Sequence, residues 1–200
     1  MNRLLKHPLK IGLTGGIGAG KTTVANILKN LGVPVFNSDE HGKKLFINNQ
    51  HVIHETIKHF GNNILTDEKI DFKKLGKIAF SNKKDLTVLN NIIHPNIADI
   101  FNKWLNKQKA KYIIKESAIL FESNTYQKLD KIILVKAPIN LRIKRTCDRD
   151  KKSVSEVKKI MQNQLPVHKI IKHVNYIVNN NEKNLLTPQV IDIHRKILNL

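Results

Sequence analysis

The sequence contains very little cysteine, few aromatic residues and few acidic residues. Its single cysteine, Cys147, excludes an internal disulfide and is typical of a protein in a reducing cytoplasm. No apolar run approaches the roughly 18 residues that a membrane-spanning helix needs. The start of the chain is basic and lacks the apolar stretch of a signal peptide. We therefore expect a soluble, cytoplasmic protein with no membrane partner.

The shortage of acidic residues leaves a large positive charge. Lysine and arginine number 35 against 16 acidic residues, so the formal net charge is +19. A surface that binds nucleic acid is one interpretation. However, the lysines are scattered through a chain rich in Lys, Asn and Ile, and the aromatic residues that would stack on bases make up only 6%. A compositional bias explains this pattern better, and we predict no nucleic-acid partner.

What the sequence does contain is a phosphate-binding loop. Residues 15–23 read G-G-I-G-A-G-K-T-T, which matches the pattern G-x-x-x-x-G-K-T. Glycines let the backbone curl around phosphate oxygens, and the helix that follows turns its positive end toward the same anion. The lysine supplies a charge for the β- and γ-phosphates, and the first threonine supplies an oxygen for Mg²⁺. The predicted nucleotide-binding residues of this loop are Gly16, Ile17, Gly18, Ala19, Gly20, Lys21, Thr22 and Thr23.

Apolar runs and helical periodicity predict the surrounding fold. The sequence predicts an α/β protein with a parallel sheet and helices between the strands. Between the second and third strands the chain is helical, with helix ends expected at Gly61 and at His94-Pro95. This block is too long for a simple crossover and is expected to form an inserted subdomain. The five expected strands are residues 10–14, 33–36, 112–116, 131–135 and 174–178.

Two classes of P-loop protein compete for this sequence. A GTPase would use residues 39–42 (D-E-H-G) and residues 82–85 (N-K-K-D) as its guanine-nucleotide motifs. Only sixteen residues lie between Thr22 and Asp39, which leaves no room for a switch segment after one helix and one strand. Residues 82–85 also follow a helical pattern rather than a buried strand. The spacing favours a small-molecule kinase.

A kinase needs an acid for the acceptor hydroxyl and cations for the transferred phosphoryl group. Asp39 follows the second strand, at the sheet edge where α/β proteins bind ligands, and is either that acid or, with Ser38, a cap of a helix beginning near Glu40. Three arginines recur at helical spacing and form either a phosphoryl clamp or a solvated basic face. These arginines are Arg142, Arg145 and Arg149.

These segments together resemble the dephospho-CoA kinases, over a stretch from Ile11 to about Asn181. The segments L-N-N-I-I-H-P and E-S-A-I-L-F-E, in this order and spacing, are far more specific than the phosphate loop. The resemblance is carried by residues 12–25, 31–39, 60–61, 70–71, 89–95, 116–122 and 145–150, and by Leu75, Phe80 and Gln164.

The resemblance implies a P-loop kinase fold and a reaction. The reaction is ATP-dependent phosphorylation of the ribose 3′-hydroxyl of dephospho-coenzyme A with Mg²⁺, the last step of coenzyme A synthesis. The alternative is another P-loop kinase that acts on a nucleotide or small molecule. We expect one domain, as a monomer or weak homo-oligomer. Its predicted parts are a core at 8–39, 110–138 and 166–200, a helical coenzyme A-binding subdomain at about 40–109 and a lid at about 139–165.

The resemblance also implies roles at the phosphate-transfer site. Asp39 would be the base, and Lys21 and Arg145 would be the other catalytic residues. Arg145 and Arg149 would lie in the lid that closes over ATP. Glu116, at the end of a strand, would help Thr22 to position Mg²⁺.

On the substrate side, the resemblance implies Asp39, Lys43, His94 and Glu122. Besides Asp39, two of these have a second interpretation. His94 could instead end a helix before Pro95, and Glu122 could instead be a helix cap.

The sequence departs from the family pattern at a few positions. Asn37 replaces the first acid of a D-A-D motif, which leaves more weight on Asp39. Lys43 replaces a usual arginine, so the charge is kept and bidentate binding is lost. Ala118 replaces a usual proline. Asn175 and Glu182 replace the aspartate and glycine that commonly flank the last strand.

Overall fold

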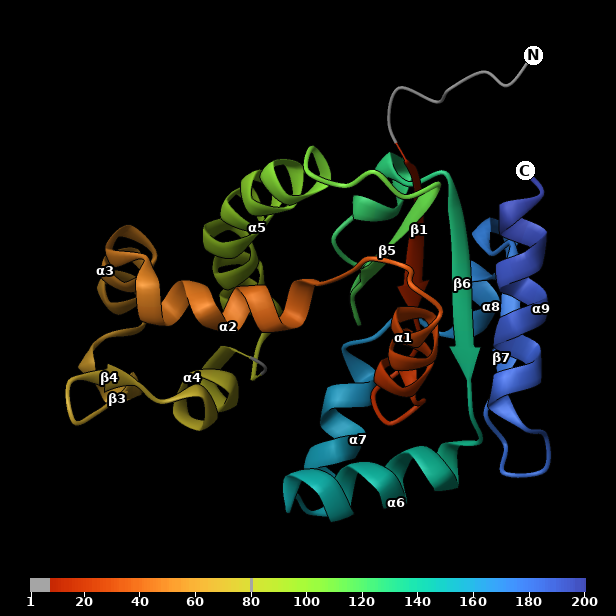
Figure 1. Ribbon diagram of the computed structural model, residues 1–200. Coiled ribbons are helices and arrows are strands. Elements are labelled where there is room, and N and C mark those ends of the chain that lie inside the picture. The colour runs from red at the N-terminus through yellow and green to blue at the C-terminus, as the bar shows by residue number, and fades with distance from the viewer. Residues whose placement is uncertain (1–7, 80) are drawn as a thin grey trace. The chain divides into compact units, whose positions relative to one another are not determined.

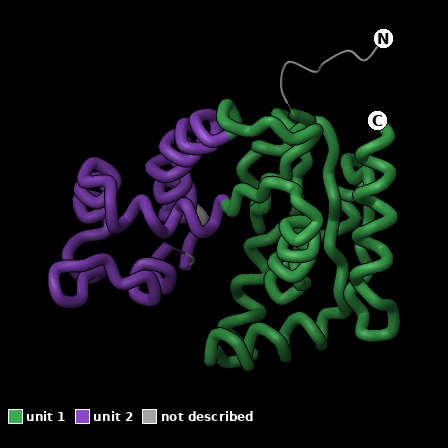
Figure 2. The backbone as a smooth tube through the Cα atoms, in the orientation of Figure 1, with its two compact units in different colours: residues 1–37, 105–200 green, residues 38–104 purple. Residues whose placement is uncertain are grey.

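The computed structural model describes residues 8–79 and 81–200 (Figure 1). Phe80, one of the residues that carry the family resemblance, lies outside the described residues. The chain forms two compact units, shown in green and purple in Figure 2. Unit 1 comprises the residues up to Asn37 together with Leu105–Leu200, and unit 2 is Ser38–Trp104.

Unit 1 is built on a five-stranded sheet with the strand order β2-β5-β1-β6-β7. All neighbouring strands run parallel, which confirms the predicted parallel sheet (Figure 1). Because β1 lies in the centre, the phosphate loop leaves the sheet between strands whose connections run in opposite directions, where open α/β sheets bind ligands. The strands are β1 Leu9–Thr14, β2 Val35–Asn37, β5 Tyr112–Glu116, β6 Lys131–Lys136 and β7 Tyr176–Asn179.

Helices cover both faces of this sheet, because alternate side chains of each strand point to opposite faces. On one face, Ile11 and Leu13 pack with apolar residues of α1 (Lys21–Asn30) and α9 (Leu186–Leu198). On the other face, Ile132 packs with Leu120 and with Ile170 of α8 (Val167–Ile170). The remaining helical elements of unit 1 are α6 Ile139–Asp150, α7 Val154–Gln162, α8 Val167–Ile170 and 3₁₀ turns at Thr125–Lys128 and Ile171–His173.

Unit 2 is mainly helical and has a core of its own. Leu45, Val52, Leu75 and Leu89 are among the buried residues that join its four helices. These helices are α2 Ser38–Asn48, α3 Gln50–Phe60, α4 Phe72–Ala79 and α5 Lys83–Leu105, and a 3₁₀ turn occupies Asn62–Ile64. As expected, Gly61 ends α3; it has a φ of 75° and donates its N–H to Ile57.

The prediction that a helix ends at His94-Pro95 is wrong. The helix α5 continues from Lys83 to Leu105 with Pro95 inside it. Proline has no N–H for the carbonyl four residues earlier and its ring crowds the preceding turn. The side-chain amide of Asn96 donates to the carbonyl of Ile92 at 2.9 Å, next to this interruption. On both sides of Pro95, α5 packs into the core of unit 2 through Leu89, Ile93 and Ile97. This tertiary packing maintains a helix that local preference alone would end.

The structure also differs from the sequence prediction in a short hairpin of unit 2. The strands β3 (Leu65–Thr66) and β4 (Lys69–Ile70) pair antiparallel within a block that was predicted to contain only helices. Asp67 and Glu68 form the turn with φ values of 49° and 60°. Such turns usually contain Gly or Asn, so the sequence lacks the signal by which hairpins are recognised.

Candidate functional site

The phosphate loop connects β1 to α1 and takes backbone conformations that glycine permits. Gly18 and Gly20 have φ values of 72° and 95°, in the left-handed region, and Gly20 is the N-cap of α1. The N–H of Ala19 donates to the carbonyl of Gly16 at 3.0 Å, which closes a tight turn. A Cβ at Gly18 would overlap the carbonyl oxygen of Arg142 and lie 2.6 Å from Thr146 Oγ1. This loop therefore needs glycine both for its φ angles and for its packing.

Lys21 and Thr22 open α1 directly behind this loop. Lys21 Nζ donates to the carbonyl of Gly15 at 2.9 Å, which places the ammonium group over the loop. Thr22 Oγ1 donates to Glu116 Oε1 at 3.0 Å. Because this proton points to the carboxylate, the hydroxyl lone pairs remain available for a cation.

Glu116 is only 3% exposed, at the end of β5, and both of its carboxylate oxygens accept hydrogen bonds. Oε1 accepts from Thr22, and Oε2 accepts from Asn37 Nδ2 at 3.1 Å. An aspartate at position 37 would instead set a second negative charge against Glu116. The asparagine therefore converts a repulsive pair into a donor–acceptor pair. The hydroxyl of Thr22 and the carboxylate of Glu116 are hard oxygen ligands of the type that Mg²⁺ prefers.

Three residues from distant parts of unit 1 hold the backbone of the phosphate loop. Arg142 Nε donates to the carbonyl of Ile17 at 3.0 Å, and the N–H of Ile17 donates to Gln164 Oε1 at 2.8 Å. Asn180 Nδ2 donates to the carbonyl of Ala19 at 2.9 Å. Burial lowers the pKa of Arg142 from its usual value. The loop is thus fixed by α6, by the segment after α7 and by the segment after β7.

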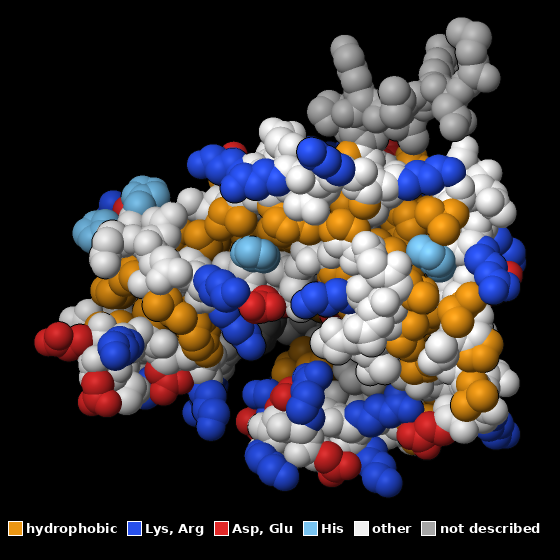
Figure 3. Space-filling model, in the orientation of Figure 1, with side chains coloured by type: hydrophobic (Ala, Val, Ile, Leu, Met, Phe, Trp, Pro, Cys, Tyr) orange, Lys and Arg blue, Asp and Glu red, His pale blue; other side chains and the backbone are white. Residues whose placement is uncertain are grey.

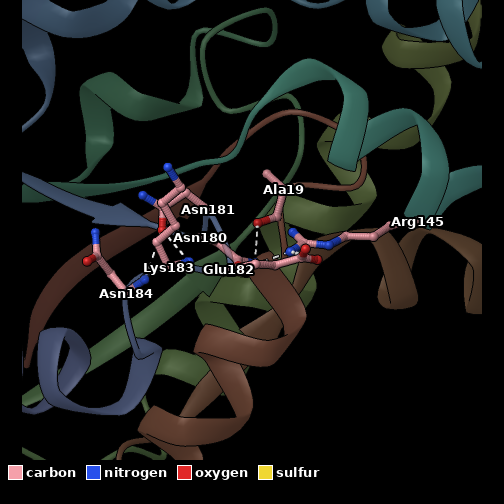
Figure 4. A network of polar contacts seen from close by, with 7 residues as sticks. All are labelled: Ala19, Arg145, Asn180, Asn181, Glu182, Lys183 and Asn184. Atoms are coloured by element: carbon pink, nitrogen blue, oxygen red, sulfur yellow. Dashed lines mark hydrogen bonds and ion pairs between the residues drawn. The ribbon is translucent and has the colours of Figure 1, made fainter.

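Figure 4 shows how the segment after β7 reaches the loop. Arg145 Nη2 lies 2.9 Å from Glu182 Oε1 and donates to Asn180 Oδ1 at 3.4 Å. Asn180 therefore bridges an arginine of α6 and the backbone of Ala19. The side chain of Arg145 is 28% exposed, and its Nη1 is buried without a hydrogen-bond partner.

The other predicted residues of unit 1 have different surroundings. Arg149 is largely exposed and makes two hydrogen bonds to Asp150, at 2.7 and 2.9 Å, which raise its pKa. Glu122 Oε1 accepts the N–H of Leu165 at 2.7 Å.

Three predicted substrate-side residues belong to unit 2. Asp39 and Lys43 are exposed on α2, which begins at Ser38 and not near Glu40, so Asp39 lies in the first helical turn rather than before it. His94 lies inside α5 and does not end a helix.

Unit 2 also has an open groove of about 350 Å³ between α3 and α5. It is lined by His51, Glu55, Val88, Asn91, Ile92, Pro95 and Asn96.

The sequence interpretation offered Arg142 only as one of three candidate clamp arginines and assigned no site role to Gln164 or Asn180, and it predicted none of their contacts with the loop backbone. Arg142 shares a helix face with Arg145, and Gln164 belongs to the family resemblance, so both carried a weak signal. Asn180 lies in a polar run that resembles an ordinary turn. It is 161 residues from Ala19, and only the strand order brings the two together.

Outside the phosphate loop, we looked for a clustered basic surface, a metal-binding group and a membrane-spanning helix. Lysine and arginine side chains are spread over the visible face of the molecule among apolar and acidic ones (Figure 3). Among the described residues, no group of three or more His, Cys, Asp and Glu side chains is arranged to hold a metal ion. No helix in residues 8–79 and 81–200 is long and apolar enough to span a membrane.

The parallel sheet and its phosphate loop define a protein of the P-loop kinase class. The chain is similar to the solved structure TT1252 from Thermus thermophilus, with a TM-score of 0.82 and 25% identity over 96% of this chain and 97% of that one. It is also similar to the dephospho-CoA kinase from Campylobacter jejuni, with a TM-score of 0.64 and 29% identity over 94% and 96%. A shikimate kinase from Acinetobacter baumannii shares the fold, with a TM-score of 0.56, 18% identity and coverage of 96% and 94%.

The particular family follows from sequence comparison. The family described as dephospho-CoA kinase matches residues 9–185. The dephospho-CoA kinase of Coxiella burnetii is 37% identical over 96% of this chain and 98% of its own length, and that of Bacteroides fragilis is 31% identical over 92% and 91%. This chain belongs to the dephospho-CoA kinase family, whose members are ATP-using phosphotransferases that catalyse the last step of coenzyme A biosynthesis.

Proposed function

We propose that this chain transfers the γ-phosphoryl group of ATP to the ribose 3′-hydroxyl of dephospho-coenzyme A. The observation that carries the proposal is the formed phosphate loop, with Lys21 over its backbone and Thr22 bound to Glu116, in a chain of this family. Phosphoryl transfer requires little covalent chemistry from the protein, so positioning and charge neutralisation supply most of the rate.

In the donor half of the site, the loop residues 16–20 and Thr23 enclose the phosphates. Lys21 contacts the β- and γ-phosphates, since its ammonium group already lies over the loop. Thr22 and Glu116 would hold Mg²⁺, which supplies positive charge to the phosphate oxygens when it is bound. Arg145, which contacts Asn180 beside the loop, neutralises charge that develops on the transferred group.

In the acceptor half, Asp39 is the base that accepts the proton of the ribose hydroxyl. It follows Asn37, a partner of Glu116, by two residues, and it is exposed in the first turn of α2. Lys43, His94 and Glu122 contact the substrate, and Arg149 belongs to a lid at about 139–165. Residues of about 40–109 hold the coenzyme A moiety, and the groove between α3 and α5 offers apolar and amide groups for part of it.

The test is an assay of ADP release with four samples: dephospho-coenzyme A, adenylate, shikimate and no acceptor. Turnover with the first acceptor alone supports the proposal. Turnover with adenylate or shikimate instead would favour another P-loop small-molecule kinase. Lys21→Ala is the control for contaminating kinases, because it removes the charge over the loop and is expected to lower kcat at least about a hundredfold.

Two further features accompany the proposal. We place the enzyme in the cytoplasm, where ATP is available, and we expect a monomer or a weak homo-oligomer. Fractionation of cells and sedimentation at several protein concentrations would test these two expectations.

A further inference from the structure

Glu182 follows β7 and takes a backbone conformation that is uncommon for its residue type. Its φ is 64°, in the left-handed region. Glycine adopts this region without a steric penalty, whereas the Cβ of a glutamate makes it strained. Glu182 Oε1 accepts a hydrogen bond from Arg145 Nη2 at 2.9 Å, so the strained residue places a carboxylate on an arginine of α6 (Figure 4).

This ion pair is connected to the phosphate loop by a short chain of contacts. The same Nη2 of Arg145 donates to Asn180 Oδ1 at 3.4 Å. The amide of Asn180 donates to the carbonyl of Ala19 at 2.9 Å. A Cβ at Gly20 would overlap Asn180 Nδ2, so the asparagine packs directly on the loop. Arg145 is therefore held next to the nucleotide-binding backbone, and Glu182 is one of its two acceptors there.

The two terminal nitrogens of the Arg145 guanidinium differ in their hydrogen bonding. Nη2 has two acceptors, whereas Nη1 is buried and has no hydrogen-bond partner. An unsatisfied buried donor on a charged group is unfavourable. The carboxylate of Glu182 is 60% exposed, and an ion pair with an exposed partner is weak. Carboxylates and phosphates can both accept two parallel hydrogen bonds from one guanidinium, but Glu182 accepts only one, from Nη2. A phosphate group that engaged both Nη1 and Nη2 would be a better partner than this carboxylate.

We propose that Glu182 is a positioning residue that holds Arg145 beside the phosphate loop and is exchanged for a phosphate group when ATP binds. This inference rests on the proposed function, in which ATP occupies the loop. In this exchange the Nη2 that now donates to Glu182 donates to a phosphate oxygen instead, so the carboxylate competes with ATP for Arg145. Glu182 therefore weakens ATP binding and keeps the arginine in place while the site has no nucleotide.

The test measures the dissociation constant of ATP by calorimetry for four proteins: the wild type, Glu182→Gln, Arg145→Gln and the double variant. We expect Glu182→Gln to tighten ATP binding about twofold to fivefold, the range that an exposed ion pair allows. In the Arg145→Gln background, the same change is expected to have no effect, because its partner is absent. A purely structural role of Glu182 would not produce this coupling.

Asp192→Asn is the matched control. Asp192 pairs with Lys196 on α9, and its side chain is 61% exposed, close to the 60% of Glu182, so the two substitutions remove the same charge from similar surroundings. We expect Asp192→Asn to leave the ATP affinity unchanged. Glu182→Gly removes the carboxylate and also the backbone strain, and it is expected to match Glu182→Gln in ATP affinity while raising the melting temperature.

Three results would overturn the inference. They are unchanged or weaker ATP binding by Glu182→Gln, an equal gain in the Arg145→Gln background, and an equal gain from Asp192→Asn. In each of these cases ATP still binds, so the proposed function stands. A wild-type protein that binds no ATP would overturn both.

Discussion

Asp39 is the residue on which the proposed chemistry depends most. We predict that Asp39→Ala lowers kcat at least about a hundredfold, because a positioned base contributes this much to proton transfer. The adjacent Glu40 is exposed in the same helical turn and pairs with Lys44 at 2.7 Å. Glu40→Ala is therefore the matched control and is expected to keep nearly normal turnover. Steady-state assays compare kcat of the two variants, and circular dichroism verifies that both keep their helix content.

The opposite result for Asp39 would be informative. If Asp39→Ala kept normal turnover while Lys21→Ala did not, the carboxylate would only stabilise the start of α2. A negative side chain in a first helical turn has that effect through the helix dipole.

Lys115 is a buried cation on β5 that the proposed reaction does not use. It is 7% exposed, and burial together with the nearby charge of Lys128 lowers its pKa from about 10.5 to about 8. The unfolded chain thus holds a proton between about pH 8 and 10.5 that the folded chain has lost. The free energy of unfolding should therefore rise with pH across this window, by up to about 1.4 kcal/mol per pH unit from this group.

The substitution Lys115→Met tests this prediction. The variant should be more stable than the wild type at pH 7, and the difference should shrink as the pH approaches 10. Urea unfolding at pH 7, 8, 9 and 10 measures the difference in the free energy of unfolding between the variant and the wild type. The substitution of the exposed Lys69 in Lys69→Met is the control. Parallel curves for wild type and Lys115→Met would contradict a lowered pKa at this position.

At the scale of elements, the phosphate loop and α6 act as one packed assembly. Gly18 touches the carbonyl of Arg142 and the hydroxyl of Thr146, so the loop conformation depends on a helix far along the chain. Thr146 is fully buried and donates to the carbonyl of Arg142 at 2.8 Å. A change in this contact is therefore expected to affect nucleotide binding as well as stability.

We predict that Gly18→Ala weakens ATP binding at least about tenfold and lowers the melting temperature. The new Cβ meets both the left-handed φ of 72° and the atoms of α6. Gly32→Ala is a control with the same backbone strain, since Gly32 has a φ of 81° and no atom within 4 Å of a Cβ. It should cost about 1–2 kcal/mol and leave ATP affinity intact. Equal effects of the two variants on ATP affinity would show that the α6 contact is unimportant.

The helix α5 contains a proline that disfavours a helix and yet continues through it. Pro95 removes a backbone hydrogen bond, yet Asn96 supplies a side-chain bond to Ile92 and accepts one from Asn49 at 3.2 Å. Asn49 in turn caps α3 by accepting the N–H of Val52. Asn96 and Asn49 thus connect the start of α3 to α5 beside the proline, although the carbonyl of Ile92 is not the one that Pro95 leaves without a donor.

At the scale of the whole molecule, the chain consists of two units with separate cores. The chain passes between them near Asn37 and near Leu105. Relative motion is the usual expectation for units that are connected in this way. Closure would also protect the phosphoryl group from water during transfer.

We predict that ATP and dephospho-coenzyme A together reduce the radius of gyration, as measured by small-angle X-ray scattering. Each ligand alone is the control and should give a smaller change, because the closed state is expected to need both. Lys21→Ala with both ligands should show a weaker response, since it loses phosphate contacts. Identical scattering of the wild type with and without both ligands would contradict closure.

Local patterns in the sequence predicted most of unit 1. The five strands and their helices follow from apolar runs of the right length, and the glycine-rich loop is recognised from its own residues, although distant residues hold its conformation. The predictions were weaker in unit 2. There the hairpin at Asp67 and Glu68 lacks the usual turn residues, and the continuity of α5 through Pro95 depends on contacts that no local pattern contains.

The sequence by itself determined that a phosphate loop lies between a strand and a helix, that the sheet is parallel and that the chain resembles one kinase family. Only the tertiary structure decided what surrounds the loop. Arg142, Gln164 and Asn180 contact it from 125, 147 and 161 residues away. These contacts follow from a strand order that places β1 at the centre, and strand order arises from the packing of the whole sheet rather than from any short segment. For the same physical reason, the Glu182 carboxylate meets Arg145 only in the folded chain.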